Sequence, residues 1–257
     1  MERIKKVAFL KIYDVWFEKT KFLSSKRPIS TLHTNEVLKK EEYDFQQIEK
    51  TFIVDISGTE EAIFSKFDYK SARYAINKAI KDGVTVHLVE TDEEKRQYWE
   101  FQREFCKTKG IPCLGEEELI ELTSLYALSK EGEYLGACSF IESEDGMTVR
   151  YKYGATLHKL NANEIILWEA MRLYHQRGFQ TFDMGGCVPT DDKSSYYYRH
   201  FHFKKKFGGE LIDTYTYFRV GGVYRIFYYV FIALVKLFFK GDVNAFTNWI
   251  NQKKILK

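Results

Sequence analysis

The sequence predicts an α/β protein built around one mixed β-sheet, and three observations support that prediction. Two segments, 132–141 and 147–155, alternate between apolar and polar residues and flank a short polar turn, as in an antiparallel pair. An amphipathic helix predicted over 161–176 follows, and it leads to a short apolar strand over 180–184. Upstream of the pair, strands and amphipathic helices alternate. This succession is typical of a sheet covered by helices.

Turn and capping signals set the element boundaries in the first part of the chain. Residues 1–50 are mixed, with a candidate strand over 7–13. A clear strand is predicted over 51–56, and Thr59 followed by two glutamates begins a helix in the preferred way. A second helix is predicted over 69–82, because the glycine that follows it suits a helix C-terminus.

The next segments complete the predicted order of elements. Alternation predicts a strand over 84–89, and a Thr-Asp-Glu-Glu run opens a helix over 91–109. A further amphipathic helix is predicted over 116–128. No internal repeat or flexible linker interrupts the chain, which favours a single domain over 1–220.

Composition places the protein among ordinary soluble domains. The chain has 257 residues, 45% of them hydrophobic and 29% charged, and a net charge of +3 that does not by itself indicate nucleic acid. The four cysteines lack metal-ligand or C-x-x-C spacing, and the N-terminus is too charged for a secretory signal peptide. We therefore expect no bound metal and free thiols in a reducing cytoplasm.

The segment over 222–239 stands apart because it is strongly apolar. Ten apolar residues run without interruption over 226–235, whereas a bilayer span needs roughly 20. Membrane-interface binding, packing within protein and a true span all remain open. Nearby lysines suit an anionic lipid surface, which would place the protein on the inner face of the cell membrane. We expect a helical tail over 221–257, in which 223–239 is the segment that would contact the membrane if the first of these alternatives holds.

The stretch over 178–210 carries the clearest chemical signal. Its predicted strand runs into Gly185 and Gly186, where the missing Cβ atoms let backbone N–H groups approach a ligand. Lys204, Lys205 and Lys206 follow a tyrosine-rich loop and would favour an anionic substrate or a developing oxyanion. A hairpin turn beside a solvated basic strand explains the same residues equally well. On such a strand, the first and third lysines would share one face.

Other residues near this stretch have two interpretations each. Asp183 is either a general base or orienter for an attacking amine, or a cap of the glycine turn. Tyr151 and Tyr153 alternate on a predicted strand and are expected to line the cleft from one face. Cys187 is a less favoured nucleophile, because no histidine and carboxylate relay is evident.

Three blocks of the sequence resemble motifs of the FemABX family of non-ribosomal peptidyl and aminoacyl transferases, which have a GNAT-like fold, and they occur in the family's order. F-S-K-F and S-A-R-Y-A-I-N-K-A, over 64–79, resemble the family's substrate-side helix. L-W-E-A-M-R, over 167–172, resembles the helix that leads into the signature strand. D-M-G-G over 183–186 and F-K-K-K-F-G-G over 203–209 resemble the C-terminal signature. The resemblance spans roughly residues 55–215.

The resemblance implies roles for particular residues. Lys204 matches the family's signature lysine and would stabilise negative charge at the acyl-transfer centre, with Gly185 and Gly186 shaping the floor. Arg73 and Lys78 would hold an anionic acceptor. Alternatively, that helix face is simply solvated and basic. The full set of expected substrate-binding residues is Lys66, Arg73, Asn77, Lys78, Tyr151, Tyr153, Gly185, Gly186 and Lys206.

The donor is the least defined part of this interpretation. The stretch over 154–164 has one glycine and lacks the glycine-rich pyrophosphate loop of acetyl-CoA-dependent GNAT enzymes, which the resemblance explains by an aminoacyl-tRNA donor. Family members typically carry two GNAT-like domains in a longer chain, which leaves another activated donor open. No bound cofactor is expected.

We expect an N-acyltransferase that moves an aminoacyl or acyl group from a tRNA ester or a thioester to an amine of an anionic or lipid-linked cell-envelope precursor, such as one for peptidoglycan. Two alternatives remain: an enzyme that uses acyl-CoA or acyl-carrier protein to acylate an amino sugar or amino acid, and a non-catalytic protein that docks on membrane. The sequence does not indicate an oligomeric state.

Overall fold

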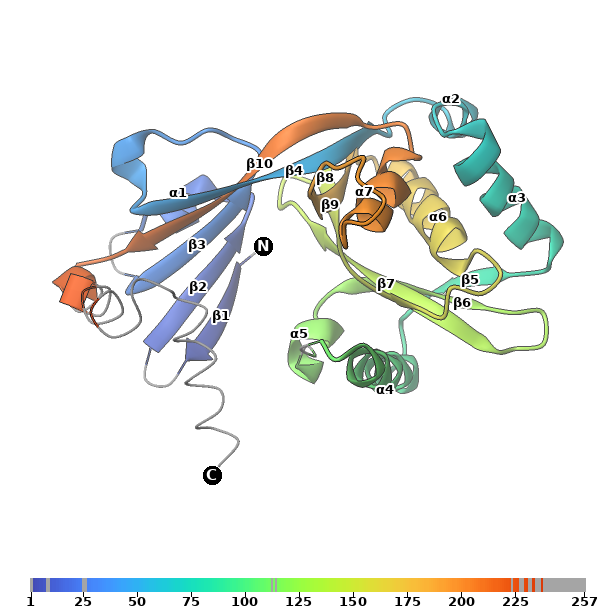
Figure 1. Ribbon diagram of the computed structural model, residues 1–257. Helices are drawn as coiled ribbons and strands as arrows, with labels where there is room; N and C mark the ends of the chain where they lie inside the picture. Colours follow the sequence, from blue (N-terminus) through green and yellow to red (C-terminus); the bar gives the residue numbers. More distant parts are fainter. Residues whose placement is uncertain are drawn as a thin grey trace. The chain divides into compact units, whose positions relative to one another are not determined.

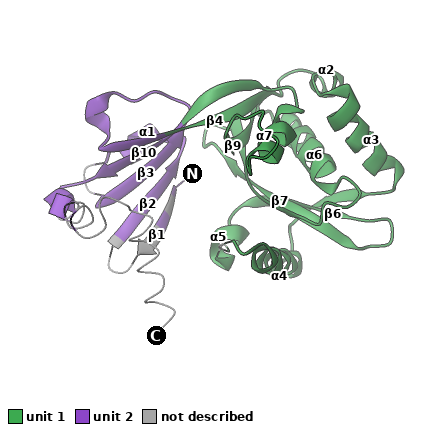
Figure 2. Ribbon diagram, viewed as in Figure 1, with its two compact units in different colours: residues 1, 48–214 green, residues 2–47, 215–257 purple. Residues whose placement is uncertain are grey.

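The chain folds into two compact units, each with its own part of a β-sheet. The computed structural model describes residues 2–7, 10–24, 27–111, 113 and 115–222, and a few positions between 224 and 237. The larger unit comprises residue 1 and residues 48–214, and the smaller one comprises 2–47 and 215–257 (Figure 2). The domain expected over 1–220 therefore includes residues of both units.

The larger unit is built on a mixed sheet with the strand order β4-β9-β8-β7-β6-β5. β9 pairs antiparallel with β4 and parallel with β8, and every later pair is antiparallel. The parallel ladder between β8 and β9 is short, because its register covers only Thr148–Arg150 and Thr181–Asp183. The strands are β4 (Phe45–Asp55), β5 (Thr85–Leu88), β6 (Thr123–Leu128), β7 (Tyr134–Glu142), β8 (Thr148–Thr156) and β9 (Thr181–Cys187).

Helices cover both faces of this sheet (Figure 1). α3 and α6 lie on one face, where Ile76, Leu167 and Met171 join the main hydrophobic core. α4 and α5 lie on the other, where Tyr98 and Leu119 form a smaller cluster with β7. The helices are α2 (Glu60–Ser65), η2 (Tyr69–Arg73, a π-helical turn), α3 (Tyr74–Lys81), α4 (Asp92–Lys109), α5 (Glu116–Ile120), α6 (Ala162–Gln176) and α7 (Tyr198–Lys205).

The smaller unit contains four strands and two short helical segments, and several of its described positions between 224 and 237 are also helical. Its strand order is β1-β2-β3-β10, with a parallel pair between β2 and β3. Val15, Leu32 and Tyr217 form its core. Two further ranges complete it: η1 (Lys40–Glu42) and α1 (Lys19–Phe22), beside the strands β1 (Glu2–Val7), β2 (Leu10–Trp16), β3 (Ile29–Thr34) and β10 (Glu210–Val220).

Most elements predicted from periodicity are confirmed, but the strand expected over 7–13 is wrong, because Val7 ends β1 and pairs antiparallel with Leu10 at the start of β2. The prediction over 116–128 is also wrong in part. The helix expected over 116–128 ends at Ile120, and β6 occupies Thr123–Leu128. β6 lies between β5 and β7, so both its edges are hydrogen-bonded by other strands. The apolar residues of this short segment fit a helix or a strand, and pairing with two neighbouring strands selects the strand. The long strand β10 and the hairpin of β1 and β2 had not been predicted in this form.

The paired glycines do not form the expected turn, because β9 continues through them to Cys187. The register with β4 shifts between Thr51 and Ile53, which places an extra residue in β9 at this point. Gly185 has φ +77°, a left-handed conformation that a bulge commonly requires of a glycine. The glycines thus bend a strand instead of ending it.

The triple lysine is also not on a strand. Lys204 and Lys205 end α7, and Lys206 is its C-terminal cap. Phe203 and Phe207 flank them at a spacing that fits one face of a strand and also one face of a helix, and the rings contact each other with centroids 5.7 Å apart. On a helix, Lys204 and Lys206 point in different directions. The strand expected from the sequence would have placed both side chains on one face.

The predicted tail lies mostly outside the described residues, and the apolar helix expected over 223–239 is not described as a whole. Among the described residues, none of the helices combines the length and the apolar character needed to cross a bilayer.

Candidate active site

The ammonium of Lys204 lies directly on the paired glycines. Its Nζ donates hydrogen bonds to the carbonyl oxygens of Gly185 at 2.9 Å and Gly186 at 2.8 Å. α7 reaches this position because Phe201 is buried against Phe52, with ring centroids 5.5 Å apart. An ammonium has three N–H bonds, and the third finds no acceptor among the described residues. That third N–H is available to a ligand.

The surroundings weaken the proton affinity of Lys204. Burial disfavours its charged form and lowers its pKa from 10.5 to about 8. Arg150 nearby lowers the pKa further, whereas Cys187, Asp183 and Glu49 oppose the shift. At neutral pH the group is therefore mostly an ammonium, and it releases a proton more readily than an exposed lysine does.

Gly185 has no room for a side chain, whereas a side chain on Gly186 would displace the end of the Glu49 side chain. A Cβ on Gly185 would lie 2.7 Å from the carbonyl oxygen of Tyr151. A Cβ on Gly186 would lie 2.5 Å from Oε2 of Glu49. The glycines therefore let β9 approach its neighbours closely while their carbonyl groups point at the Lys204 ammonium.

Asp183 holds the glycine segment and its neighbours together through hydrogen bonds. Its carboxylate is fully buried and accepts hydrogen bonds from Thr51 Oγ1, from Gly185 N at 2.8 Å and from Arg150 Nη1 at 3.0 Å. The bond to Gly185 N is the capping contact that one interpretation of the sequence expected. With these contacts, Asp183 holds the bulge and Arg150 in place. We expect it to be a positioning residue, and its role as a general base stays a prediction.

Glu49 is a second carboxylate near the paired glycines, next to Gly186. It lies near the start of β4 within the larger unit and is half-buried. Its Oε2 atom is close to the Cα of Gly186, and its charge acts on both Lys204 and Cys187. Glu49 and Lys204 thus place one negative and one positive group around the same residue.

The cysteines near the site are not activated thiols. Burial raises the pKa of Cys187, and the nearby Lys204 offsets that effect only in part. Burial also raises the pKa of Cys138 to about 12. A thiol with a raised pKa holds its proton at neutral pH and is a poor nucleophile.

Tyr151 and Tyr153 do not share a strand face, contrary to the expectation. The register of β8 with β7 shifts between Ser139 and Phe140, which leaves Lys152 as an extra residue. Tyr151 therefore packs against the main core, 6.0 Å from the ring of Phe140, with Lys204 Nζ 5.9 Å from its own ring centroid. Tyr153 donates instead to Glu118 of α5 at 3.1 Å.

Lys206 points to a different neighbour. Its Nζ contacts Glu164 Oε1 at 2.6 Å, in the first turn of α6. A glutamate in the first turn satisfies the positive end of the helix dipole with a fixed negative charge. Three of the four residues before α6, His158, Leu160 and Asn161, have positive φ without being glycine. This helix start therefore differs from the open amide cradle that binds a pyrophosphate.

Of the residues expected to grip an acceptor, Arg73, Asn77 and Lys78 lie on η2 and α3 and Lys66 caps the end of α2, and no described contact joins them to Lys204. Arg73 lies over the ring of Tyr69 at 5.0 Å, and Lys78 pairs with Asp82 at 2.8 Å. Asn77 is exposed, and Lys66 binds Asp55 at 3.0 Å. These placements do not test their predicted roles. One link exists through the backbone, where Asp68 N donates to the carbonyl of Lys206 at 2.8 Å.

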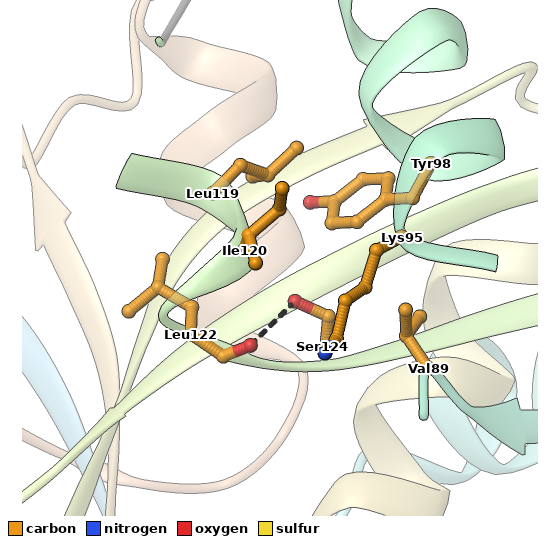
Figure 3. Close-up of a pocket in the computed structure, with 7 residues that line it drawn as sticks. All are labelled: Val89, Lys95, Tyr98, Leu119, Ile120, Leu122 and Ser124. Atoms are coloured by element: carbon orange, nitrogen blue, oxygen red, sulfur yellow. Dashed lines mark hydrogen bonds between the residues drawn. The ribbon is translucent and has the colours of Figure 1, made fainter. Parts of the chain in front are cut away.

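Two hollows of the larger unit lie elsewhere. A small pocket between α4, α5 and β6 is lined by Tyr98, Leu119 and Ser124 among others, and Ser124 Oγ donates to the Leu122 carbonyl in it (Figure 3). A cleft of about 280 Å³ lies between β5 and α6, beside Arg172. Neither contains a residue that the sequence marked as catalytic.

The sequence did not indicate Arg150, Glu49 or Thr51 as site residues. Arg150 precedes Tyr151, and no pattern in the sequence predicts that its side chain pairs with Asp183. Glu49 and Thr51 precede the signature strand by more than 130 positions, and only the pairing of β4 with β9 brings them to Gly186. The one signal in the sequence was the position of Glu49, a charged residue just before the strand predicted over 51–56.

Comparison with solved structures identifies the fold. FemX superposes with a TM-score of 0.63 at 14% identity, over 89% of this chain and 85% of the FemX chain. L-PGS from Bacillus licheniformis gives 0.57 at 14% identity, over 88% and 82%. The C-terminal domain of a putative lysylphosphatidylglycerol synthetase from Agrobacterium fabrum gives 0.56 at 10% identity, over 91% and 85%. No protein-family model matches the sequence, and no curated protein does.

These superpositions define the class of fold. The chain has the mixed α/β fold of FemX, and the predicted FemABX and GNAT-like resemblance is confirmed at the level of the fold.

Proposed function

We propose that the protein is an N-acyltransferase that moves an aminoacyl or other acyl group from an activated ester to an amine of an anionic cell-envelope precursor. The observation that carries the proposal is the Lys204 ammonium, fixed on Gly185 and Gly186 with one N–H uncommitted and a pKa of about 8. The FemX-like fold supports it, as do the two further similar structures, whose names concern a lysylphosphatidylglycerol synthetase or L-PGS.

The chemistry needs a positive group at the reacting carbonyl. Attack of the acceptor nitrogen on the donor carbonyl carbon forms a tetrahedral intermediate with a negative oxygen. A positioned donor lowers that barrier because it stabilises charge that develops only in the transition state. In this proposal the third N–H of Lys204 binds that oxygen, or gives its proton to the departing alkoxide. Its lowered pKa suits proton donation near neutral pH.

The attacking nitrogen must also lose a proton. Glu49 is the better candidate for accepting it, because it is half-buried, whereas Asp183 is fully buried and has three hydrogen-bond donors on its carboxylate. Arg150 and Asp183 would keep the bulge at Gly185 rigid while this happens.

The preferred donor is an aminoacyl-tRNA ester. Glu164 in the first turn of α6, paired with Lys206, makes that helix start a poor site for the pyrophosphate of acyl-CoA. Arg73, Asn77, Lys78 and Lys66 would hold the acceptor, and the protein would work at the cytoplasmic side of the membrane.

Incubation with tRNA charged with radiolabelled amino acids and with amine acceptors tests the proposal. We expect transfer that Lys204→Ala abolishes while the fold is retained. Ribonuclease should stop the reaction, and depletion of CoA should not. Loss with CoA depletion alone would support acyl-CoA as the donor. Transfer that Lys204→Ala leaves unchanged would disprove the proposed role of Lys204. Absence of transfer by the wild type with either kind of donor would favour a non-catalytic protein.

A further inference from the structure

The outward face of η2 and α3 is basic, aromatic and free of acidic residues. Between Tyr69 and Lys81 the chain has four cationic residues and no Asp or Glu. Tyr69 is 72% exposed and Tyr74 is 62% exposed, and Ile80 on the same helix is 54% exposed. Single exposed apolar side chains are ordinary, but these three stand on one short segment among lysines, and such gathered apolar groups mark contact surfaces. We call this surface the α3 face: Tyr69, Lys70, Tyr74, Lys78, Ile80 and Lys81.

The opposite side of the same helix fixes the α3 face in place. Ala72, Ala75, Ile76 and Ala79 are all buried, and all but Ala75 belong to the main core. Three of these four are alanines, which let the helix lie close to its neighbours. The backbone that carries the α3 face is therefore anchored in the core.

The cations of the α3 face are incompletely neutralised. Lys78 pairs with Asp82, the acidic residue that follows the helix. The ammonium groups of Lys70 and Lys81 make no ion pair with any residue that the structure describes. The guanidinium of Arg73 lies over Tyr69, and its Nε has no hydrogen-bond partner within the described parts of the chain.

We propose that the α3 face docks on an anionic phospholipid surface. Lysines attract phosphodiester headgroups, and tyrosines prefer the headgroup level, where a polar tip and an apolar ring are both satisfied. An RNA backbone would also attract the lysines, but it offers nothing for Ile80 to enter. The boundary between headgroups and acyl chains takes up such a side chain.

The α3 face begins beside the helix that carries Lys204. Asp68, whose side chain caps η2, donates its backbone N–H to the carbonyl of Lys206 at the end of α7. A bilayer held by the α3 face would thus lie near the segment that presents Lys204. The docking itself is independent of any transfer reaction and of the tail beyond residue 222.

Sedimentation of the full chain with vesicles tests the docking. The probes are phosphatidylcholine vesicles with and without phosphatidylglycerol. The test variant is Lys70→Glu with Lys81→Glu, and the matched control is Lys107→Glu with Lys109→Glu on α4, which makes the same charge change on another helix. We expect the test variant to weaken binding to anionic vesicles by at least about tenfold, and the control to weaken it far less.

A second pair of variants separates rings from charge. Tyr74→Ser should weaken binding to anionic vesicles several-fold, whereas Tyr196→Ser, at a residue 76% exposed before α7, should not. Equal losses in the test and control variants would overturn the proposal, because they would show only a general charge effect. Binding that the α3-face variants reduce for bulk tRNA and leave intact for vesicles would overturn it in favour of RNA.

Discussion

Arg150 and Asp183 form a buried ion pair across the short parallel ladder of β8 and β9, with Nη1 and Oδ2 3.0 Å apart. The two side chains are 9% and 0% exposed. The pair joins the strand that carries Tyr151 to the strand that carries the two glycines. It therefore fixes the geometry around Lys204 without reaching a ligand itself.

Removing Arg150 should destabilise the protein strongly. Arg150→Met leaves the Asp183 carboxylate buried without its cation, and breaking a buried pair in this way costs about 3–5 kcal/mol. Urea denaturation measures the change in the free energy of unfolding. Lys159→Met is the control, because its pair with Glu133 is short, at 2.6 Å, but exposed, and such pairs contribute about 0–1 kcal/mol. Similar losses in the two variants would contradict the structural role of Arg150.

The lowered pKa of Lys204 leads us to expect that activity falls at alkaline pH. Its pKa in the folded protein is about 8, below the usual 10.5. The ammonium is lost as the pH rises through about 8, and we expect kcat/KM to fall on that alkaline limb. In Lys204→Arg, which stays charged, any residual activity should lack this limb. A limb that persists unchanged in the variant would assign it to another group.

The lowered pKa of Lys204 also leads us to expect that the free energy of unfolding depends on pH. The unfolded state binds more protons at Lys204 than the folded state between pH 8 and 10.5. The buried ammonium therefore costs stability below pH 8, and this cost is relieved as the pH rises through that window. The difference in unfolding free energy between the wild type and Lys204→Met should shift in favour of the wild type over the same range. A difference that is flat with pH would contradict the lowered pKa.

Gly185→Ala should cost more than an ordinary glycine substitution. Its φ of +77° is unfavourable for alanine, and the new Cβ would lie 2.7 Å from the Tyr151 carbonyl oxygen. Gly132→Ala is a matched control with φ +82° and open space around the Cβ. The left-handed conformation alone costs about 1–3 kcal/mol, and we expect Gly185→Ala to exceed the control in thermal unfolding. It should also reduce transfer, because the carbonyl that holds Lys204 moves.

Glu49→Gln tests the base of the proposed reaction. Removing a general base lowers rates by about 10²–10⁴-fold, and we expect the loss in kcat with KM little changed. Glu118→Gln is the control, because Glu118 bonds to Tyr153 on the opposite side of the sheet. Asp183→Asn should instead lower the melting temperature, which separates a positioning residue from a base. Full activity in Glu49→Gln would remove Glu49 from the mechanism.

Local patterns in the sequence were enough to predict the helices α3, α4 and α6, the hairpin of β7 and β8, and the class of fold. Those elements are long and periodic, and their ends carry glycine or capping residues such as Thr91 and Gly178. The signature motifs also brought Lys204 and the two glycines together correctly, because their order along the chain is informative by itself.

Only the tertiary structure decided the details of the site. Phe203 and Phe207 fit a strand and a helix equally well, and packing of Phe201 on Phe52 selects the helix that delivers Lys204 and turns Lys206 to Glu164. Bulges in β8 and β9 shift which side chains face the core, and these depend on partner strands that are distant in the chain. The sequence alone therefore determined the long periodic elements, while strand pairing and side-chain packing determined the ambiguous segments and which charges meet.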